Sequence, residues 1–213
     1  MDESVSWYME KKVERTLEGL AKHNIGGFYV EDEIKLIETL QDLIPQNSTV
    51  GVGDSMTLFE TGVIEFLRSG KYNFLDKYRA GITSEEKKEL YRKNFSADVF
   101  MCSTNAVTEK GELYNIDGNG SRVAAMLYGP ERVIIVAGIN KIVNNLEEAE
   151  KRVRNYAAPI DARRLNKDTP CTSLGYCIDC NSKDRICNDF VVIRRQFNRD
   201  RIKVIIVGRH LGY

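Results

Sequence analysis

The sequence predicts an α/β fold in which a mostly parallel sheet carries helices on both of its faces. Short apolar segments alternate with longer amphipathic segments along most of the chain. This alternation is typical of parallel sheets, because each strand is buried on both faces and each crossover contains a helix. The chain has 213 residues, of which 42% are apolar, and a chain of this size can bury a full core. We therefore expect one domain that covers residues 1–213.

The helices are predicted from apolar residues that recur at helical spacing and from capping residues at the helix ends. In the first helix, Val5, Met9, Val13 and Leu17 fall on one face. The helix after Thr83 begins with a hydroxyl cap and has two acidic residues in its first turn, which stabilise a helix start. Helices expected on these grounds cover residues 4–23, 32–43, 84–94, 119–127 and 146–156.

The strands are predicted from short apolar runs, and the most continuously apolar run covers residues 132–137. Residues 106–108 and 112–114 flank Gly111 and predict a β-hairpin, because glycine supplies the positive φ of a tight turn. The other expected strands cover residues 28–30, 49–53, 73–75, 98–102 and 201–207.

A glycine loop, GVGDSMT, joins the strand at residues 49–53 to a helix. Asp54 or Ser55 can cap this helix, which we expect to continue through Leu67. The unpaired N–H groups at such a junction attract phosphate and carboxylate groups. The loop lacks the third glycine of a dinucleotide site and the lysine of a nucleotide P-loop, and a capped turn without a ligand is the alternative. The candidate ligand contacts here are Gly51, Gly53, Asp54 and Ser55.

A polar segment covers residues 103–141 and lies between two apolar strands. It is dense in hydrogen-bonding side chains, and glycines punctuate it. Because this segment and the glycine loop both follow strands, they can converge at the carboxyl edge of the sheet, where ligands bind in such folds. The candidate ligand contacts in this segment are Asn105, Thr108, Asn115, Gly118, Asn119, Arg122 and Lys141.

Two carboxylates are candidates for a chemical step. Asp117 lies in the polar segment and could act as a general base if burial raised its pKa. Its alternative is a turn residue that bonds to its own backbone. Glu60 lies on the helix after the glycine loop, and its alternative is a solvated helix residue. Arg122 could bind a carboxylate or a phosphate with both arms of its guanidinium.

The stretch from about residue 160 to residue 190 is polar and turn-rich, and we expect a small Cys-rich excursion from the sheet domain. Its four cysteines are spaced C-x5-C-x2-C-x6-C. Four such thiols could hold a zinc ion or an iron–sulfur cluster. The spacing matches neither a zinc ribbon nor a ferredoxin, so reduced thiols or disulfides are the alternatives. The candidate metal ligands are Cys171, Cys177, Cys180 and Cys187.

Composition argues against several classes of protein. Basic and acidic residues number 31 each, and without a basic stripe we expect no nucleic-acid partner. No apolar run reaches the length of about 18 residues that a membrane span needs. The first residues are charged and lack the apolar region of a secretory signal. We therefore expect a cytoplasmic protein that is not inserted in a membrane.

Two long segments resemble the LUD domain family, which is named for its association with lactate utilisation. They are GVGDSMTLFETGV and ADVFMCSTNAVTEKGELYNIDGNGSRVAAMLYGPERVIIVAGINKIV. The later segments TPCTSLGYCIDCNSKDRIC and VIIVGRHLGY resemble the short, single-domain branch of that family. The resemblance implies a fold related to coenzyme A transferases, ribose-5-phosphate isomerase and glucosamine-6-phosphate deaminase. It also implies a site for an anionic metabolite at the strand ends.

Two functions are compatible with this resemblance. In the first, the protein binds a small anionic metabolite, such as a hydroxy acid, a phosphosugar or a nucleotide-like ligand, and any chemistry would resemble that of an isomerase or a transferase. In the second, it is a non-catalytic accessory subunit of a lactate-oxidising or redox complex. A metal held by the cysteines would then stabilise a docking element, and the partner would be a redox-complex protein. Association with a second copy of the chain is open in both cases.

Overall fold

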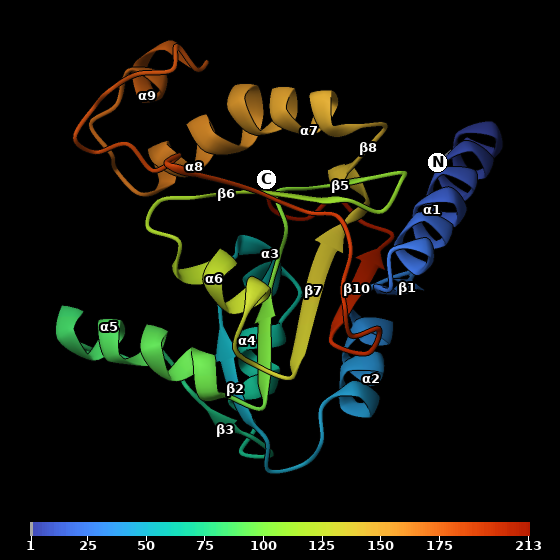
Figure 1. The fold of residues 1–213 in the computed structure, drawn as a ribbon, viewed down its shortest axis with the longest axis horizontal. Helices are drawn as coiled ribbons and strands as arrows, with labels where there is room; N and C mark the ends of the chain where they lie inside the picture. The colour runs from blue at the N-terminus through green and yellow to red at the C-terminus, as the bar shows by residue number, and fades with distance from the viewer. Residues whose placement is uncertain (1) are drawn as a thin grey trace.

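The computed structural model describes residues 2–213 and contains a six-stranded sheet and a four-stranded sheet, which Figure 1 shows with their helices. The strands of the larger sheet follow the order β1-β10-β7-β4-β2-β3, and each neighbouring pair is parallel. The predicted α/β fold with a mostly parallel sheet is therefore confirmed. The strand bounds are Gly26–Val30 (β1), Thr49–Val52 (β2), Asn73–Phe74 (β3), Val99–Cys102 (β4), Arg132–Gly138 (β7) and Ile202–Val207 (β10).

The core lies on both faces of the larger sheet. Along β7, Val133 and Ile135 belong to the cluster on one face, whereas Ile134 and Val136 belong to the cluster on the other. Successive side chains of a strand point to opposite faces, so a continuously apolar strand is buried on both sides. Helices α1 and α6 cover the first face, and α2, α3 and α4 cover the second. The helix bounds are Glu3–Lys22 (α1), Glu33–Leu43 (α2), Met56–Glu60 (α3), Val63–Leu67 (α4) and Ser121–Leu127 (α6).

Helix α5, Ser84–Lys93, begins with the predicted cap. The Thr83 hydroxyl accepts a hydrogen bond from the N–H of Glu86 at 3.2 Å, and the Glu86 carboxylate accepts one from the N–H of Thr83 at 2.7 Å. This reciprocal pair satisfies two backbone donors that the helix itself leaves free. Within residues 2–213, no helix is both long enough and apolar enough to cross a membrane.

The helix expected after the glycine loop is broken in two, so the prediction of one helix through Leu67 is wrong. Helix α3 ends at Glu60, and Gly62 precedes α4 with a φ of +70°. This left-handed backbone favours glycine and turns the chain between the two helices. Ser55 caps α3, because its hydroxyl accepts a hydrogen bond from the N–H of Leu58 at 3.3 Å.

The smaller sheet contains the predicted hairpin and two strands that the sequence did not predict, a two-residue strand and a longer one. Strands β5 and β6 are antiparallel, and Gly111 between them has a φ of +83°, as expected. The longer of these two, β9, pairs antiparallel with β6. The order is β8-β5-β6-β9. The bounds are Ala106–Thr108 (β5), Leu113–Asp117 (β6), Ile142–Val143 (β8) and Asp189–Ile193 (β9).

A long helical segment packs on the smaller sheet, at the top of Figure 1. Helix α7 (Leu146–Arg152), a π-helical turn (Val153–Ala157) and α8 (Ala158–Arg164) follow one another directly. The expected helix end at residue 156 is therefore wrong. The Cys-rich stretch starts within α8 and runs into β9, and its excursion from the sheet domain stays a prediction. Between them lies the short helix α9, Pro170–Leu174.

The contact between α1 and the hairpin turn predicts the effect of a substitution at Gly19. A Cβ atom on Gly19 would lie 2.7 Å from both the carbonyl oxygen of Glu109 and the nitrogen of Gly111. We expect Gly19→Ala to lower the free energy of unfolding by about 1–3 kcal/mol, because no side-chain rotation relieves overlap with backbone. By helix propensity alone, alanine would stabilise the helix by about 1 kcal/mol relative to glycine. The predicted change in stability therefore has the opposite sign to the one that helix propensity predicts.

Chemical denaturation measures this change. Glu18→Ala, at the exposed neighbouring position of the same helix, is the matched control and should alter stability by no more than about 0.5 kcal/mol. A Gly19→Ala protein as stable as the original would contradict the close approach of α1 to the hairpin.

Candidate functional site

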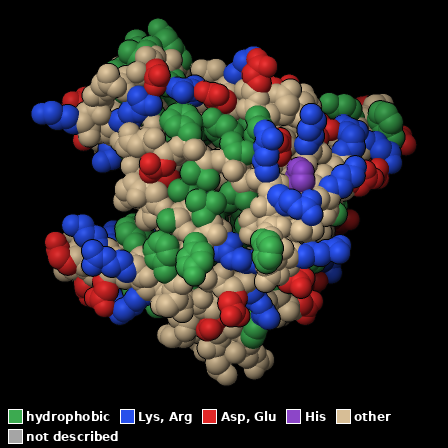
Figure 2. Space-filling model, in the orientation of Figure 1, with side chains coloured by type: hydrophobic (Ala, Val, Ile, Leu, Met, Phe, Trp, Pro, Cys, Tyr) green, Lys and Arg blue, Asp and Glu red, His purple; other side chains and the backbone are tan. Residues whose placement is uncertain are grey.

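A pocket of about 560 Å³ lies at the carboxyl ends of β2, β4 and β7. Its other walls come from α5, α8 and residues 183–187. Figure 2 shows the molecule hollowed between α5 and α8, with Lys and Arg side chains on both sides of the hollow. The glycine loop and the polar segment meet here, as expected for segments that follow neighbouring parallel strands. Eight of the predicted site residues line this pocket: Asp54, Ser55, Asn105, Asp117, Gly118, Asn119, Arg122 and Lys141.

The other predicted binding or catalytic residues of these segments lie outside the pocket: Gly51, Gly53, Glu60, Thr108 and Asn115. Close packing explains why glycine stands at positions 51 and 53. A Cβ atom on Gly51 would collide with the Asn94 side chain, and one on Gly53 would lie 2.9 Å from Cγ of Arg122. The N–H of Gly53 also donates to the carbonyl of Met101 at 2.8 Å, so it is not free to bind an anion.

Glu60 and Thr108 have partners of their own away from the pocket. The Glu60 carboxylate accepts a hydrogen bond from the N–H of Gly212 at 2.6 Å and faces a second recess, which Arg152 also lines. Thr108 lies in the hairpin, where its hydroxyl accepts a hydrogen bond from the N–H of Glu112 at 3.1 Å. Neither side chain is placed to contact a ligand in the main pocket.

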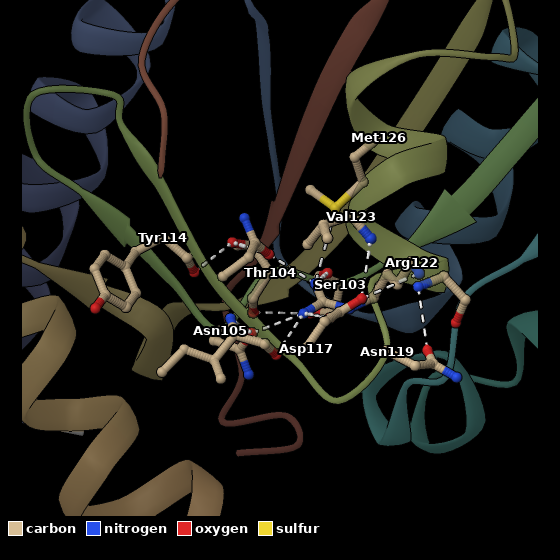
Figure 3. A network of polar contacts seen from close by, with 12 residues as sticks. Ser103, Thr104, Asn105, Tyr114, Asp117, Asn119, Arg122, Val123 and Met126 are labelled. Atoms are coloured by element: carbon tan, nitrogen blue, oxygen red, sulfur yellow. Dashed lines mark hydrogen bonds and ion pairs between the residues drawn. The ribbon is translucent and has the colours of Figure 1, made fainter. Parts of the chain in front are cut away.

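The guanidinium of Arg122 is the centre of a buried polar network, shown in Figure 3. One amino group donates to the carbonyl of Ser103 at 2.8 Å and to Oδ1 of Asn115 at 2.7 Å. The other donates to Oδ1 of Asn105 at 2.9 Å and pairs with Asp117 at 2.6 Å. These bonds occupy the donors that would grip an anion with both arms. The contacts of Arg122 therefore favour a role in positioning the pocket loops over direct binding.

The carboxylate of Asp117 anchors the start of α6. One oxygen accepts hydrogen bonds from the backbone N–H groups of Arg122 at 3.1 Å and Val123 at 3.0 Å, and the other oxygen pairs with the Arg122 guanidinium. The first-turn N–H groups of a helix have no partner within the helix, so an adjacent carboxylate stabilises them. Both oxygens of Asp117 are engaged, and its use as a general base stays a prediction that these contacts do not favour.

Lys141 lies at the floor of the pocket, in a short 3-10 turn after β7. The residue is only 3% exposed, and its Nζ donates to the hydroxyl oxygens of Thr57 at 3.0 Å and Ser103 at 2.8 Å. Burial, together with the positive charges of Arg152 and Arg122, lowers the pKa of Lys141 to about 7. Its two hydrogen-bond partners are neutral hydroxyls, and within residues 2–213 no carboxylate forms an ion pair with it.

Asp54 is held by a residue that sequence reasoning missed. Lys77 is 2% exposed and forms an ion pair with Oδ1 of Asp54 at 2.9 Å, and the hydroxyl of Tyr78 donates to the same oxygen at 3.1 Å. Burial alone would raise the pKa of Asp54, but the ammonium of Lys77 outweighs it and lowers this pKa. Lys77 stands in no recognisable motif, so the sequence contains no signal for this pair.

The walls of the pocket carry more positive than negative charge, with seven Lys and Arg residues against four Asp residues. Three of those aspartates, Asp54, Asp117 and Asp161, are already paired with basic side chains. A concave surface with this excess raises the local concentration of anions. The positive residues that the sequence analysis did not select are Lys87, Arg164, Lys167, Lys183 and Arg185. They come from three separate stretches of the chain, and only the fold brings these stretches together.

The cysteines fall into two groups. Cys102 is buried in β4, and burial raises its pKa to about 12, so its thiol is not activated as a nucleophile. The four predicted metal ligands are free thiols. Across residues 2–213, no group of three or more His, Cys, Asp or Glu side chains is already arranged to hold a metal ion. The predicted metal site therefore has no preformed set of ligands.

Comparison with known proteins gives one family match. A model of the LUD domain family matches residues 13–207. No curated protein matches the chain. Among solved structures, the chain is similar to a DUF162 family protein from Deinococcus radiodurans. The two share 12% identity, with a TM-score of 0.50 over 94% of this chain and 98% of that chain. This likeness concerns the fold alone.

Two ribose 5-phosphate isomerases show a fainter structural likeness. Ribose 5-phosphate isomerase A from Neisseria gonorrhoeae has a TM-score of 0.38 and 16% identity, over 84% of this chain and 93% of that chain. The isomerase from Plasmodium falciparum has a TM-score of 0.33 and 17% identity, over 59% of this chain and 65% of that chain. Neither likeness is close enough to assign an activity to this chain.

The Arg122 network predicts a large loss of stability in Arg122→Lys. A lysine keeps the positive charge but cannot reach the acceptors on Ser103, Asn105 and Asn115 at once. Because buried acceptors would lose their donors, we expect the free energy of unfolding to fall by about 3 kcal/mol in chemical denaturation. Arg132→Lys, at an exposed position, is the control and should change it by less than about 0.5 kcal/mol. If the two variants were equally stable, the network would not depend on Arg122, and direct ligand binding by Arg122 would again be favoured.

Proposed function

Since this chain belongs to the LUD domain family, we propose that it binds a small anionic metabolite in the pocket at the carboxyl edge of the sheet. The observation that carries the proposal is the buried amino group of Lys141, whose hydrogen-bond partners are two neutral hydroxyls and which forms no ion pair within residues 2–213. The Glu60 carboxylate acts on it only without direct contact and is bonded to the N–H of Gly212. Burying an ammonium group costs free energy unless an anion pairs with it. An anionic group seated beside Lys141 would supply that pairing.

The surroundings of Lys141 favour an anion over a neutral ligand. Arg152 and Arg122 are close enough that their charges lower the pKa of Lys141, so the floor of the pocket is electropositive. Lys87, Lys167 and Lys183 line the same pocket. A carboxylate or phosphate group would therefore be stabilised both at the floor and along the walls.

The polar groups beside the floor suit a ligand that also carries hydroxyl groups. Asn105 and Asn119 line the pocket with amide groups, and Ser55 adds a hydroxyl. Amides and hydroxyls both donate and accept, so they can pair with the hydroxyls of a hydroxy acid or a phosphosugar. We therefore favour ligands of these two classes, which also fit an association with lactate or organic-acid utilisation.

Lys141 is also the best candidate for acid–base chemistry, if the pocket is catalytic. A catalytic acid or base works best when its pKa is close to the operating pH, and the pKa of Lys141 is about 7. The two carboxylates selected from the sequence are less well placed, because Asp117 is fully bonded and Glu60 faces a different recess. An isomerase-like or transferase-like step would accordingly use Lys141 to move a proton.

Ligand binding predicts a stabilisation that depends on Lys141. In a thermal-shift screen with hydroxy acids, sugar phosphates and sulfate, a binding anion at about 100 times its Kd should stabilise the protein by about 2.7 kcal/mol. Lys141→Met should remove this effect while the variant remains folded, because a thioether fills the buried space without a charge. Lys151→Met, which changes an exposed lysine on α7, should respond like the original protein. No stabilisation by any of these anions would count against the proposal.

The low pKa of Lys141 predicts that anion binding weakens as the pH rises. The amino group is charged below about pH 7 and neutral above it, and a bound anion favours the charged form. Above pH 7, binding must therefore take up one proton, and affinity should fall by up to about tenfold per pH unit. Sulfate is the suitable probe, because its own charge is constant across this range. Isothermal titration in buffers of different ionisation enthalpy measures the proton uptake, and a pH-independent affinity would rule out the role of Lys141.

A further inference from the structure

Four cysteines surround a second, closed cavity next to α8. Cys171, Cys177, Cys180 and Cys187 all line it, and its volume is about 20 Å³. Pro159 of α8 is among its apolar walls. A cavity of roughly 10–15 Å³ is enough for one water molecule, so this space can hold a single ion.

The chain around the central pair of cysteines is turned in the way that a metal-bound thiolate needs. Asp179 has a φ of +51°, and its N–H donates to Sγ of Cys177 at 3.3 Å. A guanidinium nitrogen of Arg154 lies 4.0 Å from the same sulfur, and the hydroxyl of Thr169 lies 3.2 Å from Sγ of Cys171. Donors placed around the sulfurs stabilise thiolates and orient metal ligands.

The segment that carries these cysteines has almost no apolar core of its own. Between residues 165 and 188, Thr169 is the one buried residue, and α9 buries none. Leu174 and Tyr176 are 47% and 53% exposed. Small units without a core are usually held by a metal ion or by disulfides. The four thiols are all free, which leaves them available to a metal.

We propose that Cys171, Cys177, Cys180 and Cys187 bind one zinc ion as a structural site. Zinc prefers four tetrahedral ligands and binds thiolates at about 2.3 Å. Each thiol releases its proton to solvent when it binds, so four protons leave and the loaded site carries two negative charges. The guanidinium groups of Arg154 and Arg185 lie beside it. The side chains must turn inward to reach the ion, as expected where metal binding and local ordering are coupled.

The zinc ion would also shape the main pocket. Residues 183–187 form one of its walls, and they lie between Cys180 and Cys187. The Arg185 guanidinium donates to the backbone carbonyls of both cysteines. Fixing the two cysteines therefore fixes the wall that presents Lys183 and Arg185 to the pocket. Zinc binding does not depend on the proposed anion site, because it is measured without any anion.

Metal analysis of the full-length chain, purified anaerobically with zinc and iron both supplied, tests the site. We expect one zinc per chain, retained in Cys102→Ala, which removes the one cysteine outside the cluster. Cys177→Ser and Cys187→Ser should lose most of the zinc. Reconstitution with cobalt should give the intense visible absorption of a tetrahedral cobalt–thiolate centre in the original protein and in Cys102→Ala.

A second measurement covers the case in which the serine variants do not fold. Thiol alkylation of the original protein should leave the four cysteines protected, and a chelator should expose all four together. Iron with sulfide in place of zinc would overturn the proposal. The proposal would also be overturned if the serine variants retained zinc. The same holds if the cysteines formed disulfides and the reduced protein bound no cobalt, or if a chelator did not change the extent of alkylation.

Discussion

The buried guanidinium of Arg122 is the interaction on which the pocket depends. It extends from α6 to the link between β4 and β5 and to strand β6. It therefore joins the carboxyl end of β4, in the larger sheet, to the hairpin of the smaller sheet. A planar group with five donors can hold several acceptors in one fixed geometry. Without it, the carbonyl of Ser103 and the side chains around it would be buried without partners, which is costly in a low-dielectric interior.

The two cations at the floor of the pocket have opposite electrostatic situations, and this contrast defines the site. Arg122 forms an ion pair with Asp117 at 2.6 Å, so it has a counter-charge in direct contact. Lys141 has only the hydroxyls of Thr57 and Ser103. A buried group whose charge is left uncompensated destabilises the empty protein, and such groups are concentrated at functional sites. Arg122 thus holds the pocket loops together, and Lys141 is the cation that we propose to bind the ligand.

The strands of the larger sheet, the hairpin and several helices could be predicted from the sequence because each has a local signal, whereas β8 and β9 could not. Continuous apolarity indicated β7, and glycine indicated the hairpin turn. The errors arose where tertiary packing decides the backbone. Gly62 interrupts an apolar pattern that otherwise reads as one helix, and a π-helical turn carries the chain into α8 with Pro159 near its start, where proline is tolerated.

The candidate site was only partly predictable, for a related reason. The polar segment was correctly placed at the strand ends, but residue type does not show whether a polar side chain faces a ligand or another side chain. The Arg122 guanidinium donates to Oδ1 of Asn115 at 2.7 Å, so both groups face each other and not a ligand. The pair between Lys77 and Asp54, and the basic walls, join residues that are distant in the chain. A single sequence contains no pattern for such pairs.

The order of strands in the larger sheet has a consequence for how this chain is made. Strand β1 occupies one edge and pairs only with β10, the last strand in the chain. During synthesis, β1 must wait until residues 202–207 have left the ribosome before its strand partner is available. Contacts between such distant segments form slowly, and an unpaired strand exposes its backbone to other chains in the meantime. Strand β1 is therefore a segment of the nascent chain that protection by a chaperone would benefit.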